Sequence, residues 1–136
     1  MGTVLSGSLP AVPDALEPPT RGRPPQPAHG RLLPPTSAPA HGERSERVVR
    51  IGDVEVEQVL SGVLGDAVTY DQEYDEWALV LEGAAVLEIG AARVELAAGE
   101  WVLLPAHLVH RLVDARPGTS WLTLRAGPAD THGTPQ

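Results

Sequence analysis

Apolar and polar residues alternate with a period of two from Arg47 onward, which is typical of β-strands and not of helices. Short apolar stretches follow one another at intervals of roughly ten residues, with turn pairs such as Gly52-Asp53 and Pro117-Gly118 between them. The pattern predicts an all-β sandwich or barrel without a helix of three turns. The expected strands are residues 47–51, 54–60, 67–72, 76–83, 84–89, 93–97, 101–105, 110–115 and 120–126.

Several of these strands are apolar on both faces, as at residues 76–83 and 101–105. One face of such a strand lines the barrel interior, and the other needs cover from a second sheet or a second subunit. We therefore expect a homodimer. The chain has no phenylalanine, so valine, leucine, alanine and the three tryptophans must supply the core.

The first 45 residues have a different composition, because they hold ten of the fourteen prolines. Proline pairs such as Pro18-Pro19 exclude helix and central strand, and the scattered apolar residues cannot bury enough surface to offset ordering. The sequence predicts a disordered proline-rich arm over residues 1–45, a folded domain over 46–127 and a disordered tail over 128–136. The arm carries a net charge of +1, which leaves −9 on the remainder.

The composition also excludes several classes of chemistry. Without cysteine there is no disulfide, thiolate metal site or cysteine nucleophile, and without lysine there is no Schiff base or P-loop lysine. A net charge of −8 disfavours nucleic acid as a partner. No apolar run approaches the roughly 18 residues of a membrane helix. We expect a cytoplasmic protein that binds neither nucleic acid nor membrane.

The polar residues that could bind a ligand or take part in catalysis lie in two stretches, residues 70–83 (YDQEYDEWALVLEG) and 99–111 (GEWVLLPAHLVHR). Tyr70 and Gln72 are two positions apart and so point to one face of an extended chain. Glu76 opens an apolar strand, and its side chain shares a face with positions expected inside the barrel. A carboxylate there needs a partner or a metal ion. The acids at 71, 73 and 75 are expected to face solvent.

The spacing of these residues resembles the motifs of the cupins, a family of small β-barrels. The first cupin motif ends in a glutamate, six residues and a glycine, as do Glu76 and Gly83 here. The second places a glycine five residues before a proline and a histidine further on, as at Gly99, Pro105 and His110. The resemblance covers residues 47–126 and implies a double-stranded β-helix, or jelly roll.

The chain departs from the family pattern at four positions. The two histidines of the first motif fall on Tyr70 and Gln72, while His107 takes the place of the second motif's glycine and Asp114 that of its asparagine. The resemblance implies a divalent metal held by Gln72 Oε1, the Glu76 carboxylate and His110 Nε2, with water or Tyr70 completing the shell. Such an oxygen-rich set suits Mn, Fe(II), Ni or Zn and selects none of them.

Three kinds of function are compatible with these residues. A metal-dependent enzyme of the isomerase or lyase type would polarise a carbonyl or a bound water on a small polar substrate, and Tyr70, Glu76 or His107 would move a proton. The alternative is a non-catalytic module that binds or senses a small ligand in a metal-free site. A storage barrel with a filled interior is the third possibility. The three tryptophans are expected to pack in the apolar strands.

Overall fold

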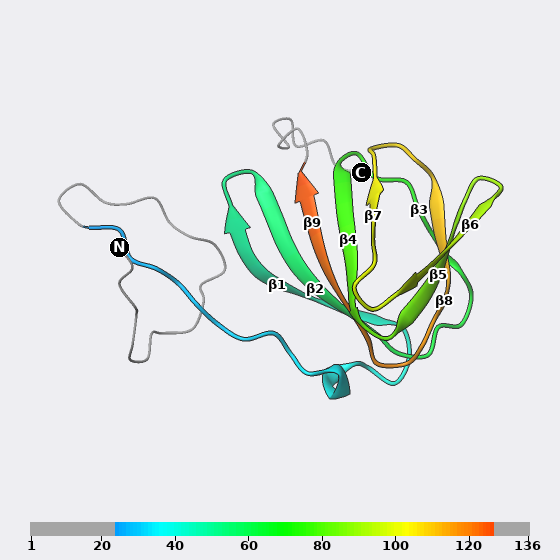
Figure 1. The fold of residues 1–136 in the computed structure, drawn as a ribbon, viewed down its shortest axis with the longest axis horizontal. Helices are drawn as coiled ribbons and strands as arrows, with labels where there is room; N and C mark the ends of the chain where they lie inside the picture. The colour runs from blue at the N-terminus through cyan, green and yellow to red at the C-terminus, as the bar shows by residue number, and fades with distance from the viewer. Residues whose placement is uncertain (1–23, 127–136) are drawn as a thin grey trace.

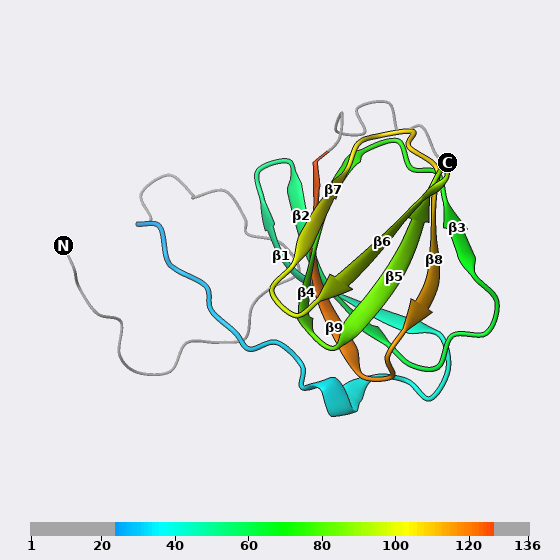
Figure 2. The ribbon, with the colours of Figure 1, turned by 45° about the vertical axis from the view of Figure 1, so that its right-hand side comes forward.

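The computed structural model describes residues 24–126, which form two facing antiparallel sheets (Figures 1 and 2). One sheet has the strand order β1-β2-β9-β4-β7, and the other has the order β3-β8-β5-β6. The strands are β1 (Glu43–Ile51), β2 (Val54–Ser61), β3 (Val68–Tyr70), β4 (Asp75–Glu82), β5 (Ala84–Ile89), β6 (Ala92–Ala97), β7 (Trp101–Leu104), β8 (His110–Ala115) and β9 (Thr119–Ala126).

The predicted all-β jelly roll is confirmed, and each of the nine expected stretches contains a strand. A three-residue 3-10 helix, η1 (Pro35–Ser37), precedes β1. Within the described part of the chain, no helix is long and apolar enough to cross a membrane. β1 begins at Glu43, four residues before the predicted start at residue 47, because pairing with β2 extends it over a polar stretch.

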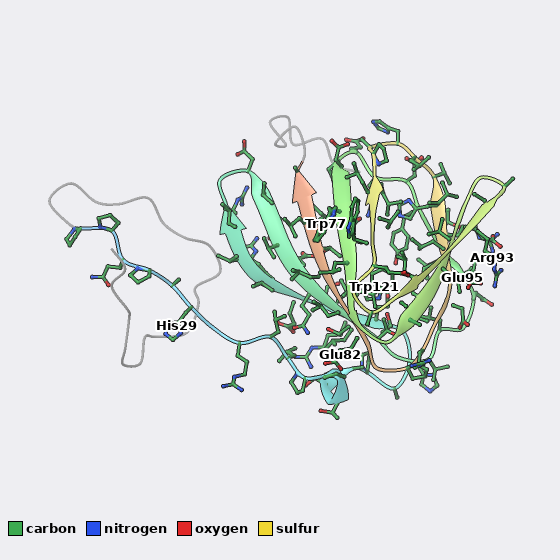
Figure 3. All side chains as sticks on the ribbon, viewed as in Figure 1. His29, Trp77, Glu82, Arg93, Glu95 and Trp121 are labelled. Atoms are coloured by element: carbon green, nitrogen blue, oxygen red, sulfur yellow. The ribbon has the colours of Figure 1, made fainter. Side chains whose placement is uncertain are left out.

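The core lies between the two sheets and is built from small and medium side chains with one tryptophan. Trp121 of β9 is 5% exposed and packs between the sheets (Figure 3), with its indole N–H donating to Ser61 Oγ at 3.2 Å. The other members of the cluster are Ala78, Val80, Ala85, Leu87, Leu96, Leu112 and Ala115. Because strand residues alternate between faces, Ala78 and Val80 of β4 both point into this cluster.

The turn between β4 and β5 depends on a glycine. Gly83 has φ +97°, a conformation that side chains with a Cβ rarely adopt. A Cβ at this position would stand 2.4 Å from Thr119 Oγ1, so the turn is closed against the start of β9. The buried Thr119 hydroxyl also accepts a hydrogen bond from the Ala84 N–H at 3.2 Å. This contact joins the two sheets at one end of the barrel.

The segment before β1 is extended and contacts the outer face of the five-stranded sheet. The side-chain amide of Gln58, which is 2% exposed, exchanges two hydrogen bonds with the backbone of Leu33, at 2.8 and 2.9 Å. Gln58 also donates to Ser120 Oγ at 3.1 Å. Further along, a Cβ on Gly62 would stand 2.0 Å from the Pro39 carbonyl oxygen, so backbone packs on backbone there.

Residues 24–45 belong to the stretch for which the sequence predicts a disordered arm, whereas in the structure residues 24–42 lead through η1 into β1 and residues 43–45 are the start of that strand. The beginning of residues 24–42, with His29, lies outside the barrel (Figure 3). The predicted disorder of residues 1–23 and of the tail from residue 128 falls outside the described residues.

The outer face of β4, β9 and β7 is apolar. Trp77 of β4 lies against Trp101 of β7, with ring centroids 5.9 Å apart. Trp101 is 57% exposed and Leu103 is 54% exposed, and both are on the edge strand of the sheet. Two of the three tryptophans thus pack on the outside of the barrel, and only Trp121 is in its core.

Candidate metal and ligand pocket

A pocket of about 220 Å³ lies between the two sheets. This volume is below the range of about 300–1,000 Å³ that is usual for drug-sized ligands, so the pocket suits a small molecule. Its wall carries three carboxylates (Glu43, Glu57 and Glu76) and the side chains of Arg125 and His110. Two tyrosines, a tryptophan, several aliphatic residues and the polar residues Ser45, Gln72 and Thr123 complete the lining. The presence of this pocket disfavours the filled storage barrel.

Glu76 is one of the three carboxylates of the pocket wall. It is paired with Arg125 of β9 and Leu104 of β7 in the sheet register, so the Glu76 and Arg125 side chains stand side by side on the inner face. Burial raises the pKa of the Glu76 carboxyl, while a hydrogen bond from Gln72 and the charges of His110 and Arg125 oppose that rise. The carboxylate therefore lacks enough positive charge around it to offset its desolvation.

His110 is 4% exposed and lines the pocket. Its Nδ1 lies 2.9 Å from the Leu108 carbonyl oxygen. Because a carbonyl can only accept a hydrogen bond, Nδ1 carries the proton in the neutral ring, and Nε2 keeps its lone pair. An arrangement in which Nδ1 is fixed by a backbone carbonyl is the usual one for histidines that bind metals through Nε2.

Tyr70 lies against His110 because the two residues are register partners on β3 and β8. Their rings stack with centroids 5.3 Å apart and planes 19° apart. The Tyr70 hydroxyl donates to Glu43 Oε1 at 3.1 Å, and Glu43 also accepts from Ser61 Oγ at 2.7 Å. Burial, with the Glu43 charge and hydrogen bond as further causes, raises the pKa of Tyr70 well above its usual range. Tyr70 thus remains a neutral phenol that donates a hydrogen bond.

Arg125 is a pocket residue that sequence reasoning missed. Its Nη2 pairs with Glu57 at 2.6 Å, its Nη1 donates to the Tyr74 hydroxyl at 3.2 Å, and its guanidinium lies 5.1 Å from the Tyr74 ring centroid. Burial lowers the pKa of Arg125, but the bond to Tyr74 and the Glu57 charge raise it overall. Its alternation with Trp121 and Thr123 along the strand could have revealed the inward direction.

His107 was expected to be catalytic, but the structure does not bring its side chain into the pocket. Its imidazole is 70% exposed, and Nδ1 lies 3.9 Å from an Asp71 oxygen that is also at the surface. The backbone is the part of His107 that reaches the site, because its N–H donates to the Gln72 carbonyl at 2.7 Å. Asp75, which was expected only to face solvent, accepts a hydrogen bond from the Ala106 N–H at 2.9 Å.

The three expected metal ligands, Gln72, Glu76 and His110, all line this pocket. Among residues 24–126 no three His, Cys, Asp or Glu side chains gather into a metal-binding group, and the expected set has only two such residues besides the glutamine. The donors nevertheless fit a divalent cation, because a buried carboxylate short of positive charge stands beside an imidazole with a free Nε2 lone pair. Gln72 would bind the cation through its side-chain oxygen after a rotation that exchanges the positions of its amide oxygen and nitrogen.

Comparisons with known proteins agree with the fold and the motif spacing. Residues 59–120 match the family model of the Cupin domain. No protein of curated function matches the sequence. A Ralstonia eutropha JMP134 structure, provisionally named a mannose-6-phosphate isomerase, is 27% identical with a TM-score of 0.62 over 74% of this chain and 99% of that one.

Two further solved structures share the fold at lower identity. KdgF from a Halomonas species is 22% identical, with a TM-score of 0.57 over 67% of this chain and 85% of that one. The cupin domain of an XRE family transcriptional regulator from Enterobacter cloacae is 11% identical, with a TM-score of 0.53 over 65% of this chain and 99% of that one.

Proposed function

Because this chain is a small cupin-domain protein, we propose that it binds a divalent metal ion and a small polar molecule in the pocket at Glu76, as a metal-dependent enzyme of the isomerase or lyase type. The observation that carries the proposal is the convergence of Gln72, Glu76 and His110 on one 220 Å³ pocket. Glu76 and His110 come from different sheets, and Gln72 comes from the loop that joins β3 to β4.

A divalent ion at this site would polarise a carbonyl or a bound water. The protein's own groups have separate tasks around it. Tyr70 donates its phenolic proton to Glu43, and its oxygen can accept a hydrogen bond from a ligand hydroxyl. Arg125 places a fixed positive charge beside Glu76 and orients a polar ligand by hydrogen bonds. The aliphatic residues and Trp121 on the remaining wall limit the space for water.

A second function is favoured by one specific contact. The Gln72 side chain lies close enough to Glu76 to lower the pKa of its carboxyl, so it opposes part of the rise caused by burial without any metal. In that case the pocket is a metal-free site that binds or senses a small ligand, in which Gln72, Tyr70 and Arg125 are hydrogen-bonding groups. The cupin domain of the XRE family regulator is an example of this fold within a transcriptional regulator.

Metal titration distinguishes the two functions. Purified protein is stripped with chelator and titrated with Mn²⁺, Fe²⁺, Ni²⁺ and Zn²⁺ by calorimetry, together with Gln72→Ala, Glu76→Ala and His110→Ala. We expect one ion per chain in the wild type and a loss of at least about tenfold in affinity for each variant. Glu73→Ala, an exposed acid in the same loop, is the matched control and should bind as the wild type does. A wild type without stoichiometric metal refutes the metal function.

Catalysis has a separate test. Isomerases and lyases that act next to a carbonyl exchange a carbon-bound proton with solvent. Small aldoses, ketoses and keto acids are incubated with metal-loaded protein in D₂O, and deuterium incorporation is followed by NMR. We expect exchange with at least one compound that is lost in Glu76→Ala. Binding without exchange across the whole panel would favour the sensing module.

We also propose that the protein is a homodimer joined through the outer face of β4, β9 and β7. This face is apolar, and its edge strand carries the exposed Trp101 and Leu103. A two-fold axis would place the same apolar face on both sides of the interface, so each copy would cover the apolar face of the other. Trp101→Glu should convert a dimer mass into a monomer mass in sedimentation, whereas Ile51→Glu, at an equally exposed residue elsewhere, should not. A wild-type monomer at micromolar concentration refutes the dimer.

A further inference from the structure

The turn at residues 105–108, between β7 and β8, is attached to the loop that carries Gln72. The His107 N–H donates to the Gln72 carbonyl oxygen at 2.7 Å. Three residues after Gln72, Asp75 Oδ1 accepts a hydrogen bond from the Ala106 N–H at 2.9 Å. The N–H groups of two adjacent turn residues therefore hold the loop at Gln72 and at Asp75, three residues apart. Gln72 is also the residue whose side chain lies beside Glu76.

His107 has a backbone conformation that is uncommon for residues other than glycine. Its φ is +66°, and it is the one non-glycine residue with positive φ in the described part of the chain. This left-handed conformation crowds the Cβ of an L-residue, and such strain persists where the surrounding structure holds it. The conformation directs the N–H of His107 to the Gln72 carbonyl.

The imidazole of His107 has no comparable contact. It is 70% exposed, it is not among the residues that line the pocket, and its ion-pair distance of 3.9 Å to Asp71 joins two exposed groups. An exposed pair at that distance contributes little, because solvent screens it. What this position offers the pocket is a peptide N–H in a fixed direction.

We propose that His107 serves the pocket through its backbone, and that its left-handed conformation, together with the Asp75 carboxylate, fixes the loop that directs Gln72 to Glu76. His107 is then a positioning residue, and its side chain carries no proton in the reaction. The inference rests on the proposed role of Gln72 as a metal ligand. It also gives a role to the acid at position 75, which bonds to the turn and does not line the pocket.

A substitution series at position 107 tests the backbone role. Glycine and asparagine adopt positive φ readily, whereas valine does not. We expect His107→Gly and His107→Asn to bind Mn²⁺ within about threefold of the wild type, and His107→Val to bind at least about tenfold more weakly, the size of effect seen when a residue that orients a metal ligand is changed. If the glycine and asparagine variants lose as much affinity as the valine variant, the imidazole is what matters and the proposal is wrong. Equal affinity in all three variants also overturns it.

Asp75 gives a second route that leaves position 107 intact. Asp75→Ala removes the acceptor of the Ala106 N–H and should weaken Mn²⁺ binding at least about tenfold by the same reasoning. Asp71→Ala is the matched control, because it removes an exposed acid from the same loop, and it should bind within about threefold of the wild type. This pair keeps the proposal testable if His107→Val does not fold. Wild-type affinity in Asp75→Ala would overturn the two-point attachment.

A measurement without metal separates failure of this inference from failure of the proposed function. The side-chain amide resonances of Gln72, assigned by their absence in Gln72→Ala, report its orientation in metal-free protein. They should shift or broaden in His107→Val and Asp75→Ala and stay in place in His107→Gly and Asp71→Ala. A wild type that binds no metal but shows this pattern refutes the metal function alone. Unmoved resonances in His107→Val and Asp75→Ala refute the positioning role.

Discussion

Replacing Gln58 by leucine tests how the segment before β1 is held on the barrel. The side chain makes three hydrogen bonds, two with the Leu33 backbone and one with Ser120 Oγ, at 2.8, 2.9 and 3.1 Å. Leucine has a similar volume, so the substitution removes the hydrogen bonds without opening a large cavity. At about 1 kcal/mol net for each bond, we expect Gln58→Leu to lower the free energy of unfolding by about 3 kcal/mol.

That loss has two measurable consequences. The melting temperature should fall by roughly 15 °C, at about 5 °C for each kcal/mol in a domain of this size. Trypsin should also cut faster after Arg31, which lies two residues before the anchored Leu33. Gln26→Leu is the matched control, since Gln26 is an exposed glutamine of the same extended segment, and its melting temperature should stay within about 2 °C of the wild type.

The result also bears on the pocket, because the segment continues directly into Glu43, which accepts the Tyr70 hydroxyl. A Gln58→Leu protein that melts within about 3 °C of the wild type and is cut after Arg31 at the same rate would refute the reasoning. In that case the segment is held by other contacts or is not held at all in solution.

Three further substitutions test the turn, the pocket cation and the pocket phenol. Gly83→Ala should lower the free energy of unfolding by more than about 2 kcal/mol in chemical denaturation, because positive φ and a contact at 2.4 Å act together. Gly90→Ala, where φ is also positive but the space around the glycine is open, should lower it by only about 1 kcal/mol. Equal losses in the two variants would contradict the packing argument. Arg125→Met leaves the partly buried Glu57 without its partner, so we expect a loss of about 1–3 kcal/mol in the same assay, and an unchanged stability would show that the pair contributes nothing. Tyr70→Phe removes one hydrogen bond and should lower the free energy of unfolding by about 1 kcal/mol. Its Mn²⁺ affinity, measured by calorimetry, should stay within about threefold of the wild type. A larger loss of affinity would indicate that Tyr70 is a metal ligand.

The strands could be predicted from the sequence because alternation is a local property. A period of two fixes which side chains share a face, so Tyr70 and Gln72, and the position of Glu76 at the start of an inward-facing row, could be identified before any fold was known. Motif spacing added His110, which the structure places on the same pocket. These residues lie within or directly beside strands, where the sequence pattern and side-chain direction are tightly linked.

The remaining features depend on contacts between residues far apart in the chain. Glu43 is in the stretch predicted to be disordered, and pairing of β1 with β2 is what places it on the pocket wall. Arg125 becomes a pocket residue because β9 lies between β2 and β4, which sets it beside Glu76. The parity of Arg125 was visible in the sequence, but its partners were not.

His107 shows most clearly where sequence reasoning ends. A histidine at the glycine position of the second motif was expected to move a proton, and its direction could not be derived from strand parity because it lies in a turn. The backbone dihedrals decide that its imidazole faces solvent and its N–H faces Gln72. The sequence by itself determined the strands, the faces and the kinds of donor. Tertiary structure alone decided which of those groups meet, because strand order and turn conformation are set by long-range pairing and not by local pattern.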